Sequence, residues 1–265
     1  MPRIFYILSL VVLLSACNRF AKFQRNASPD EKLTKAIEYY NKKDYYKAGV
    51  LLEEIVPILK GKQGAEDASY YFAYNYYMQK QYVMSSYYFK DFYMTYPRSA
   101  RVEECMFMNV KSLYNSSPEY NLDQEYTYNA IKALNTFLDR YPKTQYMEEC
   151  NKMADELNAK LVKKAYESAY LYYKIHNYKS ATIALTNFLK DYPSTEYTEA
   201  AMYYRVEAQL KLAKNSVEGE KQIERYYDVV DYYQMYADRF PKGQYAKEAL
   251  DAYDYAVNQL NSLKK

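Results

Sequence analysis

The sequence is poor in the residues from which catalytic and metal centres are usually built. Its 265 residues include one histidine, His176, three cysteines and no tryptophan. The histidine has no acidic neighbour in the sequence, and the chain contains no glycine-rich phosphate loop, no GxSxG motif and no HExxH motif. We therefore expect no catalytic residue, no metal site and no cofactor, and we assign His176 to the protein surface.

Glycine is also scarce, with five residues, which favours a nearly all-helical chain with short turns. The net charge is only +3, and acidic and basic residues are interspersed, so the sequence has no basic stripe for a nucleic acid. We expect neither a nucleic acid nor a small-molecule substrate as a partner.

The sequence instead contains a motif that recurs along the chain: a large apolar residue, three further residues, an aromatic residue and a proline. Its four clear copies end at Pro97, Pro142, Pro193 and Pro241, and a degenerate copy has Lys60 in the proline position. In the clear copies, a small or β-branched residue stands twelve positions before the proline. Large apolar residues stand four and seven positions after that small residue. This spacing defines one face of a helix that the proline ends.

These copies predict the second helices of tetratricopeptide-like units, which stack because one unit cannot bury its apolar face alone. We expect an all-α fold, a superhelical array of about five tetratricopeptide-like helix pairs over residues 28–265, closed by a C-terminal capping helix at about 245–263. The run at 146–174 contains no proline or glycine. We expect it to form a long helix that extends past the stack as an arm.

Two acidic pairs, Glu103-Glu104 and Glu148-Glu149, could suggest paired catalytic carboxylates. They lie in register with the motif prolines, so we interpret them as charges in the first turns of helices. Cys105 and Cys150 also occupy equivalent positions in successive repeats. We interpret both cysteines as small buried residues that lie roughly 10 Å apart on stacked helices, too far apart for a disulfide.

Residues 1–16 have the features of a lipoprotein signal peptide, with Arg3 before a short apolar run. The order Leu14-Ser15-Ala16-Cys17 is a lipobox, which predicts cleavage after Ala16 and acylation of Cys17. Several acyl chains anchor a protein stably. Asn18, in the next position, favours the outer membrane over the inner membrane.

Residues 17–27 are predicted to be a lipidated tether that is polar, basic and without periodicity. The repeat domain then begins at residue 28. Ser28 can cap the first helix, Pro29 suits its first position, and Glu31 completes a capping box.

Tyrosine is the outlier of the composition, with 38 residues. In the second unit, Tyr70, Tyr74 and Tyr77 follow helical spacing, with Tyr71 beside them. Tyrosine offers a large contact area with few rotatable bonds, which suits peptide binding. We therefore name Tyr70, Tyr71, Tyr74 and Tyr77 as candidates for a peptide-binding groove. The alternative is that these side chains pack in the core between helices.

The lipobox, the short basic tether and the repeats together resemble the BamD family, the lipoprotein subunits of the machinery that assembles outer-membrane β-barrels. The resemblance is carried by four stretches: LSAC at 14–17, GAEDASYYFAYNYY at 64–77, SYYFKDFYMTYPRSARVEEC at 86–105 and NFLKDYPSTEYTEAAMYY at 187–204. It implies a non-enzymatic protein, lipid-anchored on the periplasmic face of the outer membrane. It also implies a BamA-like barrel subunit bound by the C-terminal repeats, and unfolded outer-membrane proteins received by the N-terminal repeats.

Two other kinds of function remain open. The chain could be a periplasmic repeat adaptor that coordinates cell-wall synthesis with outer-membrane constriction, although such adaptors usually lack a lipobox. It could also be an enzyme built on a helical solenoid, such as a lytic glycosidase. An enzyme of that kind needs a compact extra domain with a catalytic carboxylate, and the sequence has no stretch outside the repeats to build one.

Overall fold

The computed structural model describes residues 19–263, and every regular element within that range is a helix. Ala16 and Cys17 lie outside the described residues, so the signal peptide, its cleavage and the acylation stay predictions. The helices are α2 (Pro29–Asn41), α3 (Tyr45–Leu59), α4 (Ala65–Met78), α5 (Tyr82–Thr95), α6 (Val102–Ser116), α7 (Glu125–Arg140), α8 (Met147–Lys174), α9 (Tyr178–Asp191), α10 (Thr198–Lys214), α11 (Glu220–Arg239) and α12 (Ala246–Leu263).

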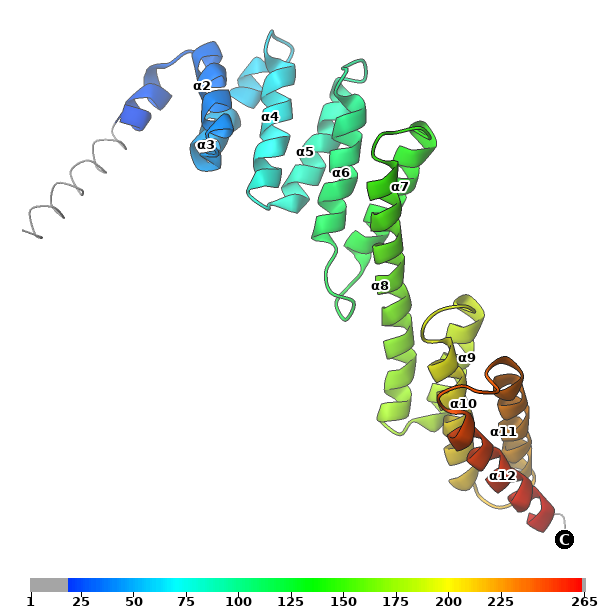
Figure 1. Cartoon of the computed structure of the whole chain (residues 1–265). Helices are drawn as coiled ribbons and strands as arrows, with labels where there is room; N and C mark the ends of the chain where they lie inside the picture. Colours follow the sequence, from blue (N-terminus) through cyan, green and yellow to red (C-terminus); the bar gives the residue numbers. More distant parts are fainter. Residues whose placement is uncertain (1–18, 264–265) are drawn as a thin grey trace, which may run out of the picture. The chain divides into compact units, whose positions relative to one another are not determined.

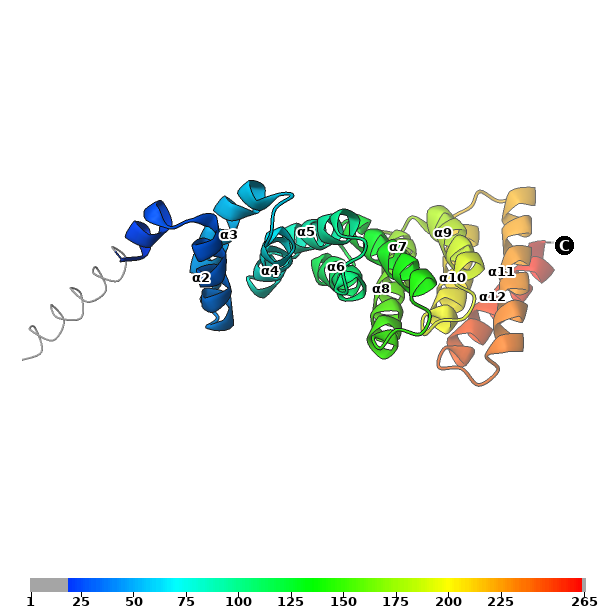
Figure 2. The ribbon, with the colours of Figure 1, turned by 90° about the horizontal axis from the view of Figure 1, so that it is seen from above.

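The chain divides into two compact units. The first contains the residues up to Pro118 together with Asp123–Leu157, and the second contains Glu119–Leu122 together with Asn158–Lys265. Within the first unit, each of the helices α2 to α6 contacts the next one along the chain, as far as α7 (Figure 1). Within the second unit, α10 contacts α9, α11 and α12 (Figure 2). The predicted all-α array of helix pairs is confirmed, and α12 is the predicted closing helix.

Each copy of the proline motif is the C-terminus of a helix. The helices α5, α7, α9 and α11 all end two residues before the motif proline. The backbone N–H of the motif's aromatic residue donates to the carbonyl of its large apolar residue four positions earlier, which satisfies an otherwise unpaired group of the last turn. These bonds are Tyr96 to Phe92 (2.8 Å), Tyr141 to Phe137 (2.9 Å), Tyr192 to Phe188 (2.8 Å) and Phe240 to Tyr236 (2.8 Å).

The same motif supplies the core. Its large apolar residue is at most 4% exposed in all four copies. The small or β-branched residue that precedes it by seven positions is completely buried, which allows a neighbouring helix to approach closely. The residues at this small position, with the degenerate first copy included, are Ala48, Ser85, Ala130, Ala181 and Val229.

The long helix α8 does not extend from the stack as an arm, and this prediction was wrong. Cys150 and Met153, in its first half, belong to the core of the first unit. Tyr166 and Ala169, in its second half, belong to a core of the second unit. The first half of α8 packs in one core and its second half packs in another, which accounts for the length of the run without proline or glycine.

The two cysteines of the described chain, Cys105 and Cys150, are both buried and unbridged, as expected. Burial raises the pKa of both thiols, that of Cys150 to about 11, so both stay protonated and unreactive at neutral pH.

The acidic pairs lie in the first turns of α6 and α8, as predicted. The first acidic residue at this position of the repeat also accepts a hydrogen bond from the turn that follows the helix pair. The Ser99 hydroxyl donates to Glu66 Oε1 at 2.6 Å, and the Thr144 hydroxyl donates to Glu103 Oε1 at 2.7 Å. In both cases, the donor lies in the turn after a motif proline and the acceptor lies on the first helix of the preceding repeat.

The N-terminal segment is more ordered than its polar composition suggests. Residues 19–26 are helical, and they form the short dark-blue helix before α2 in Figure 1. The next helix begins with the predicted capping box, because Ser28 Oγ accepts from the Glu31 N–H while the Glu31 carboxylate accepts from the Ser28 N–H.

Candidate functional site

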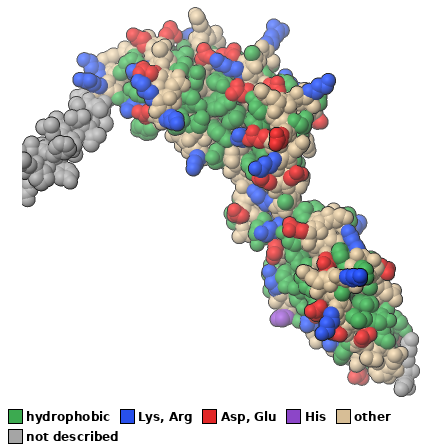
Figure 3. Space-filling view, viewed as in Figure 1, with side chains coloured by type: hydrophobic (Ala, Val, Ile, Leu, Met, Phe, Trp, Pro, Cys, Tyr) green, Lys and Arg blue, Asp and Glu red, His purple; other side chains and the backbone are tan. Residues whose placement is uncertain are grey.

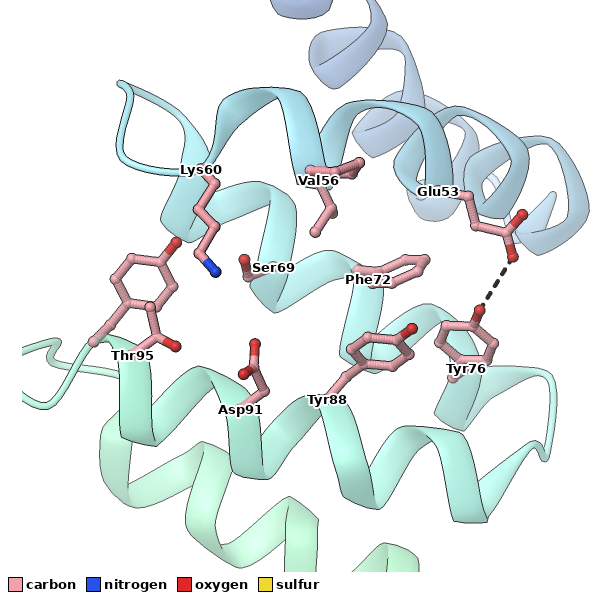
Figure 4. Close-up of a pocket in the computed structure, with 11 residues that line it drawn as sticks. Glu53, Val56, Lys60, Ser69, Phe72, Tyr76, Tyr88, Asp91 and Thr95 are labelled. Atoms are coloured by element: carbon pink, nitrogen blue, oxygen red, sulfur yellow. Dashed lines mark hydrogen bonds between the residues drawn. The ribbon is translucent and has the colours of Figure 1, made fainter.

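The first unit contains a hollow of about 500 Å³ between α3, α4 and α5. Figure 4 shows α3 and α5 on its two sides, with side chains of α4 between them. Its lining residues are Glu53, Val56, Pro57 and Lys60 of α3, Ser69, Phe72 and Tyr76 of α4, and Tyr88, Asp91, Thr95 and Tyr96 of α5 or its end.

Three aromatic rings form one wall of this hollow. Tyr76 stacks on Tyr88 with ring centroids 5.1 Å apart, and Phe72 lies 4.5 Å from Tyr88 and 4.9 Å from Tyr76. The Tyr76 hydroxyl donates to Glu53 Oε1 at 3.1 Å, which ties α4 to α3. Burial and the bond to Glu53 raise the pKa of Tyr76, so its hydroxyl remains a donor at neutral pH.

The other end of the hollow is charged. Lys60 and Asp91 point into it from opposite sides, with Ser69 and Thr95 nearby (Figure 4). An aromatic wall opposite charged and hydroxyl groups suits an apolar or aromatic side chain of a bound segment, whose backbone the polar groups can bond.

A second hollow repeats this arrangement one helix pair further along the first unit. It lies between α5, α6 and α7 and has a volume of about 570 Å³. Val83 and Tyr87 of α5 lie on its edge and are 48% and 61% exposed. Because α5 contributes to both hollows, they form a row along the unit. Hydrophobic side chains are also exposed on the face of the first unit that Figure 3 shows.

The predicted groove tyrosines lie elsewhere on α4 and do not line either hollow. Tyr70 and Tyr74 both donate to Glu104 Oε1 of α6, and the Arg101 guanidinium lies 4.4 Å from the centre of the Tyr70 ring. Burial, followed by the contacts with Glu104, raises the pKa of both hydroxyls.

The other two candidates have similar surroundings. Tyr71 packs against Tyr40 of α2 with centroids 5.2 Å apart, and the Tyr77 hydroxyl accepts from Asn115 at 3.3 Å. All four candidates are half-buried. They join α4 to its neighbours α2 and α6, as the alternative of core packing anticipated, and their part in binding stays a prediction.

The hollow was missed although its residues stand in the same tyrosine-rich stretch. Phe72 and Tyr76 are four positions apart, as are Tyr70 and Tyr74, so each pair marks a face of α4. The signal in the sequence was that aromatic residues occupy more than one face of this helix. The sequence did not indicate which face would meet the gap between α3 and α5.

Among residues 19–263, no group of three or more His, Cys, Asp or Glu side chains could hold a metal ion. His176 is exposed in the turn after α8, with Nδ1 2.8 Å from the Tyr178 hydroxyl, as its surface assignment predicted. In the same part of the chain, no helix has the length and hydrophobicity to cross a membrane.

Comparison with known proteins assigns the family. The model of the YfiO family, described as an outer membrane lipoprotein, matches residues 25–224. This chain belongs to the YfiO family. The matched range includes both hollows and the four candidate tyrosines.

Two curated relatives of this YfiO-family chain carry the BamD name, so the resemblance found in the sequence is confirmed. "Putative outer membrane protein assembly factor BamD" of Aquifex aeolicus (strain VF5) is 27% identical over 231 residues, which cover 84% of this chain and 74% of that protein. "Outer membrane protein assembly factor BamD" of Helicobacter pylori (strain ATCC 700392 / 26695) is 29% identical over 68 residues, which cover 26% of this chain and 31% of that protein.

Proposed function

We propose that this chain is a non-enzymatic scaffold of the machinery that assembles β-barrel proteins in the outer membrane, anchored on the periplasmic face through acylated Cys17. The family match and the names of the two relatives support this role. In the proposal, the scaffold binds unfolded outer-membrane proteins and a BamA-like barrel subunit, and it assists insertion of the barrels into the membrane.

The observation that carries the substrate-binding part is the row of two hollows in the first unit. A strand of an outer-membrane barrel has apolar side chains at alternate positions, and in the unfolded protein these side chains are exposed to water. The hollows offer aromatic and aliphatic walls at repeated positions along one face. An extended segment can place apolar side chains in successive hollows while Lys60, Asp91 and neighbouring hydroxyl groups bond its backbone.

The barrel-subunit part rests on the resemblance, which places that contact on the C-terminal repeats. The second unit has a small hollow beside α11 and α12 that includes Tyr233, Phe240 and Leu250. Leu250 is 41% exposed there, so an apolar side chain is available to a partner. This surface is our candidate for the contact with a BamA-like subunit.

Photo-crosslinking in cells tests the substrate-binding part. A photoreactive phenylalanine analogue replaces Tyr88 in the first hollow, Tyr87 at the edge of the second, Tyr77 in the predicted groove, or Tyr46 as a control. Tyr46 is 74% exposed and lines neither hollow. We expect barrel precursors to be captured at Tyr88 and Tyr87 well above the level at Tyr46.

The outcomes separate the parts of the proposal. Capture at Tyr77 alone would move substrate binding to the groove predicted from the sequence. Equal capture at all four positions would remove the assignment of a site. Affinity purification of the acylated protein should recover a BamA-like barrel in near-equal amount, and recovery of cell-wall factors without that barrel would favour the adaptor.

A further inference from the structure

The helical segment at residues 19–26 is docked on the first helix pair. Phe20 packs edge-on against Tyr39 of α2 with centroids 5.8 Å apart, and Phe23 packs against the same core. Gln24 Nε2 donates to Glu54 of α3, whose carboxylate also pairs with Lys32 Nζ at 2.8 Å. One face of the segment is therefore fixed to α2 and α3, and its orientation is set by the first unit.

Another face of this segment is basic. Arg19, Lys22 and Arg25 are all exposed, and their three-residue spacing places them along one side of the helix, next to Phe23. The segment contains no acidic residue. Arg25 Nε donates to the Ala21 carbonyl at 3.3 Å, and no ion pair within the described residues neutralises these three side chains.

A shallow hollow of about 390 Å³ lies beside this face. It is lined by Arg19, Lys22, Phe23, Asn26, Ala27 and Glu31. The Glu31 carboxylate is occupied by the capping box, where Oε2 accepts from both the N–H and the hydroxyl of Ser28 at 2.8 Å. Arg19, Lys22 and the Asn26 amide are the lining groups that can donate hydrogen bonds to an anion.

We propose that Arg19, Lys22 and Arg25 form a binding face for the phosphates of anionic phospholipid headgroups. This inference uses the predicted acylation of Cys17, on which the proposed function also rests. Arg19 follows Cys17 by two residues, a reach of at most about 7 Å for extended chain. That distance is within the Debye length of about 8 Å at physiological ionic strength, so charge on the membrane surface acts on Arg19 with little screening.

The rest of the face is near the same surface. The segment rises about 1.5 Å per residue, so Arg25 lies about 9 Å along the helix axis from Arg19, and a helix lying along the membrane brings all three cations to the headgroups. The acyl chains hold the protein at the membrane, and the basic face then determines which side of the first unit lies against it. The docked face transmits this orientation to α2 and α3.

Vesicle binding by the mature chain with Cys17→Ser tests the proposal, because without acylation only the protein surface contributes. The probes are vesicles of phosphatidylcholine alone and vesicles that also contain phosphatidylglycerol. We expect salt-sensitive binding to the anionic vesicles. The triple variant Arg19→Gln, Lys22→Gln, Arg25→Gln should bind them about 100-fold more weakly, from about 1 kcal/mol for each of the three cations at an anionic surface.

A matched variant, Lys62→Gln, Arg98→Gln, Lys143→Gln, removes the same charge from exposed turns of the first unit. It should bind nearly as well as the parent chain, and both variants should keep the parent's thermal unfolding, because all six side chains are exposed. Unchanged binding by the first triple variant, or an equal loss in both, overturns the proposal. Loss of an acidic protein partner with normal vesicle binding would assign the face to a protein and also overturn it.

The vesicles contain no component of the assembly machinery. Failure of this test therefore leaves the proposed function intact, and failure of the crosslinking test leaves the basic face intact.

Discussion

In both units a glutamate at the same position of the repeat accepts hydrogen bonds from other segments, but the donors differ. In the first unit, the residue two positions after the motif proline carries a hydroxyl. Ser99 donates to Glu66 and Thr144 donates to Glu103, at 2.6 and 2.7 Å. The donor and the acceptor each stand at a fixed place in their own repeat, so the contact recurs as the helix pairs succeed one another.

In the second unit, the same place after Pro241 is held by Gly243, which has no hydroxyl. The Tyr236 hydroxyl donates to Glu199 Oε1 at 2.9 Å instead, and the Tyr245 N–H donates to the same oxygen at 3.4 Å. A Cβ on Gly243 would lie 2.1 Å from that oxygen and 2.7 Å from the Tyr236 hydroxyl. The large residue of the motif has taken over the contact, and glycine leaves the space for it.

The difference shows that the repeats keep an interaction while its residues change. A glutamate in the first turn of a helix can accept a hydrogen bond from a short hydroxyl, as in the first unit, or from a tyrosine, as in the second unit. Each choice determines which residue is allowed at the second position after the proline.

The largest effect is expected from Gly243→Ala in the second unit. The added methyl group cannot fit beside Glu199 and Tyr236 without moving them, and overpacking of this kind costs about 1–3 kcal/mol of the free energy of unfolding. Urea denaturation measures this loss. The neighbouring exposed substitution Gln244→Ala should change the free energy by less than about 0.5 kcal/mol.

The cause can be separated by a double-mutant cycle with Glu199→Ala. If the clash is responsible, Gly243→Ala costs much less when Glu199 is already shortened, so the two losses do not add. Additive losses would show that glycine is required there for another reason.

A smaller effect is expected from Thr144→Val in the first unit. Valine keeps the shape of the side chain but removes both the donor to Glu103 and the acceptor of the Tyr146 N–H, which costs about 1–2 kcal/mol at about 1 kcal/mol for each hydrogen bond. The control is Thr136→Val, which removes an exposed hydroxyl that bonds only to its own helix at the Lys132 carbonyl. A loss no greater than that of the control would mean that the Thr144 contact does not stabilise the first unit.

The smallest effect concerns alkaline pH and compares one tyrosine in each unit. Burial raises the pKa of Tyr40 to about 12, and burial together with Glu207 raises that of Tyr203 to about 12. In the unfolded chain the pKa of tyrosine is about 10. Above that pH the unfolded chain releases a proton that the folded chain keeps. Stability is therefore complete below about pH 10 and declines until about pH 12.

Tyr40→Phe and Tyr203→Phe should each make this decline shallower, because phenylalanine has no proton to release. Urea titrations at pH 9 and pH 11 compare the slopes. A variant whose stability falls as steeply as that of the parent chain would show that the replaced tyrosine does not titrate in this way.

The local part of the fold was predictable from the sequence. Proline cannot continue a helix, so Pro97, Pro142, Pro193 and Pro241 located four helix ends, and the spacing of apolar residues before them located the core. The capping box at Ser28 was equally local.

Contacts between elements were not predictable in the same way. Nothing in the sequence shows that Tyr74 meets Glu104 while Tyr76, two positions later, meets Glu53 across a hollow. The sequence does contain a signal for the docking of residues 19–26. Phe20 and Phe23 stand three positions apart among polar residues, which is the spacing of one helix face. The prediction of an arm was wrong because the sequence of a long helix does not show how many hydrophobic cores its residues join.

The glutamate contact also has a fixed direction along the chain. At two joints of the first unit, the turn after a helix pair provides the donor and the first helix of that pair provides the acceptor. Six positions after the last motif proline, where Glu103, Glu148 and Glu199 stand in earlier copies, the chain has Lys247. A lysine cannot accept a hydrogen bond, so α12 begins without the acceptor that Glu66, Glu103 and Glu199 supply in earlier helices.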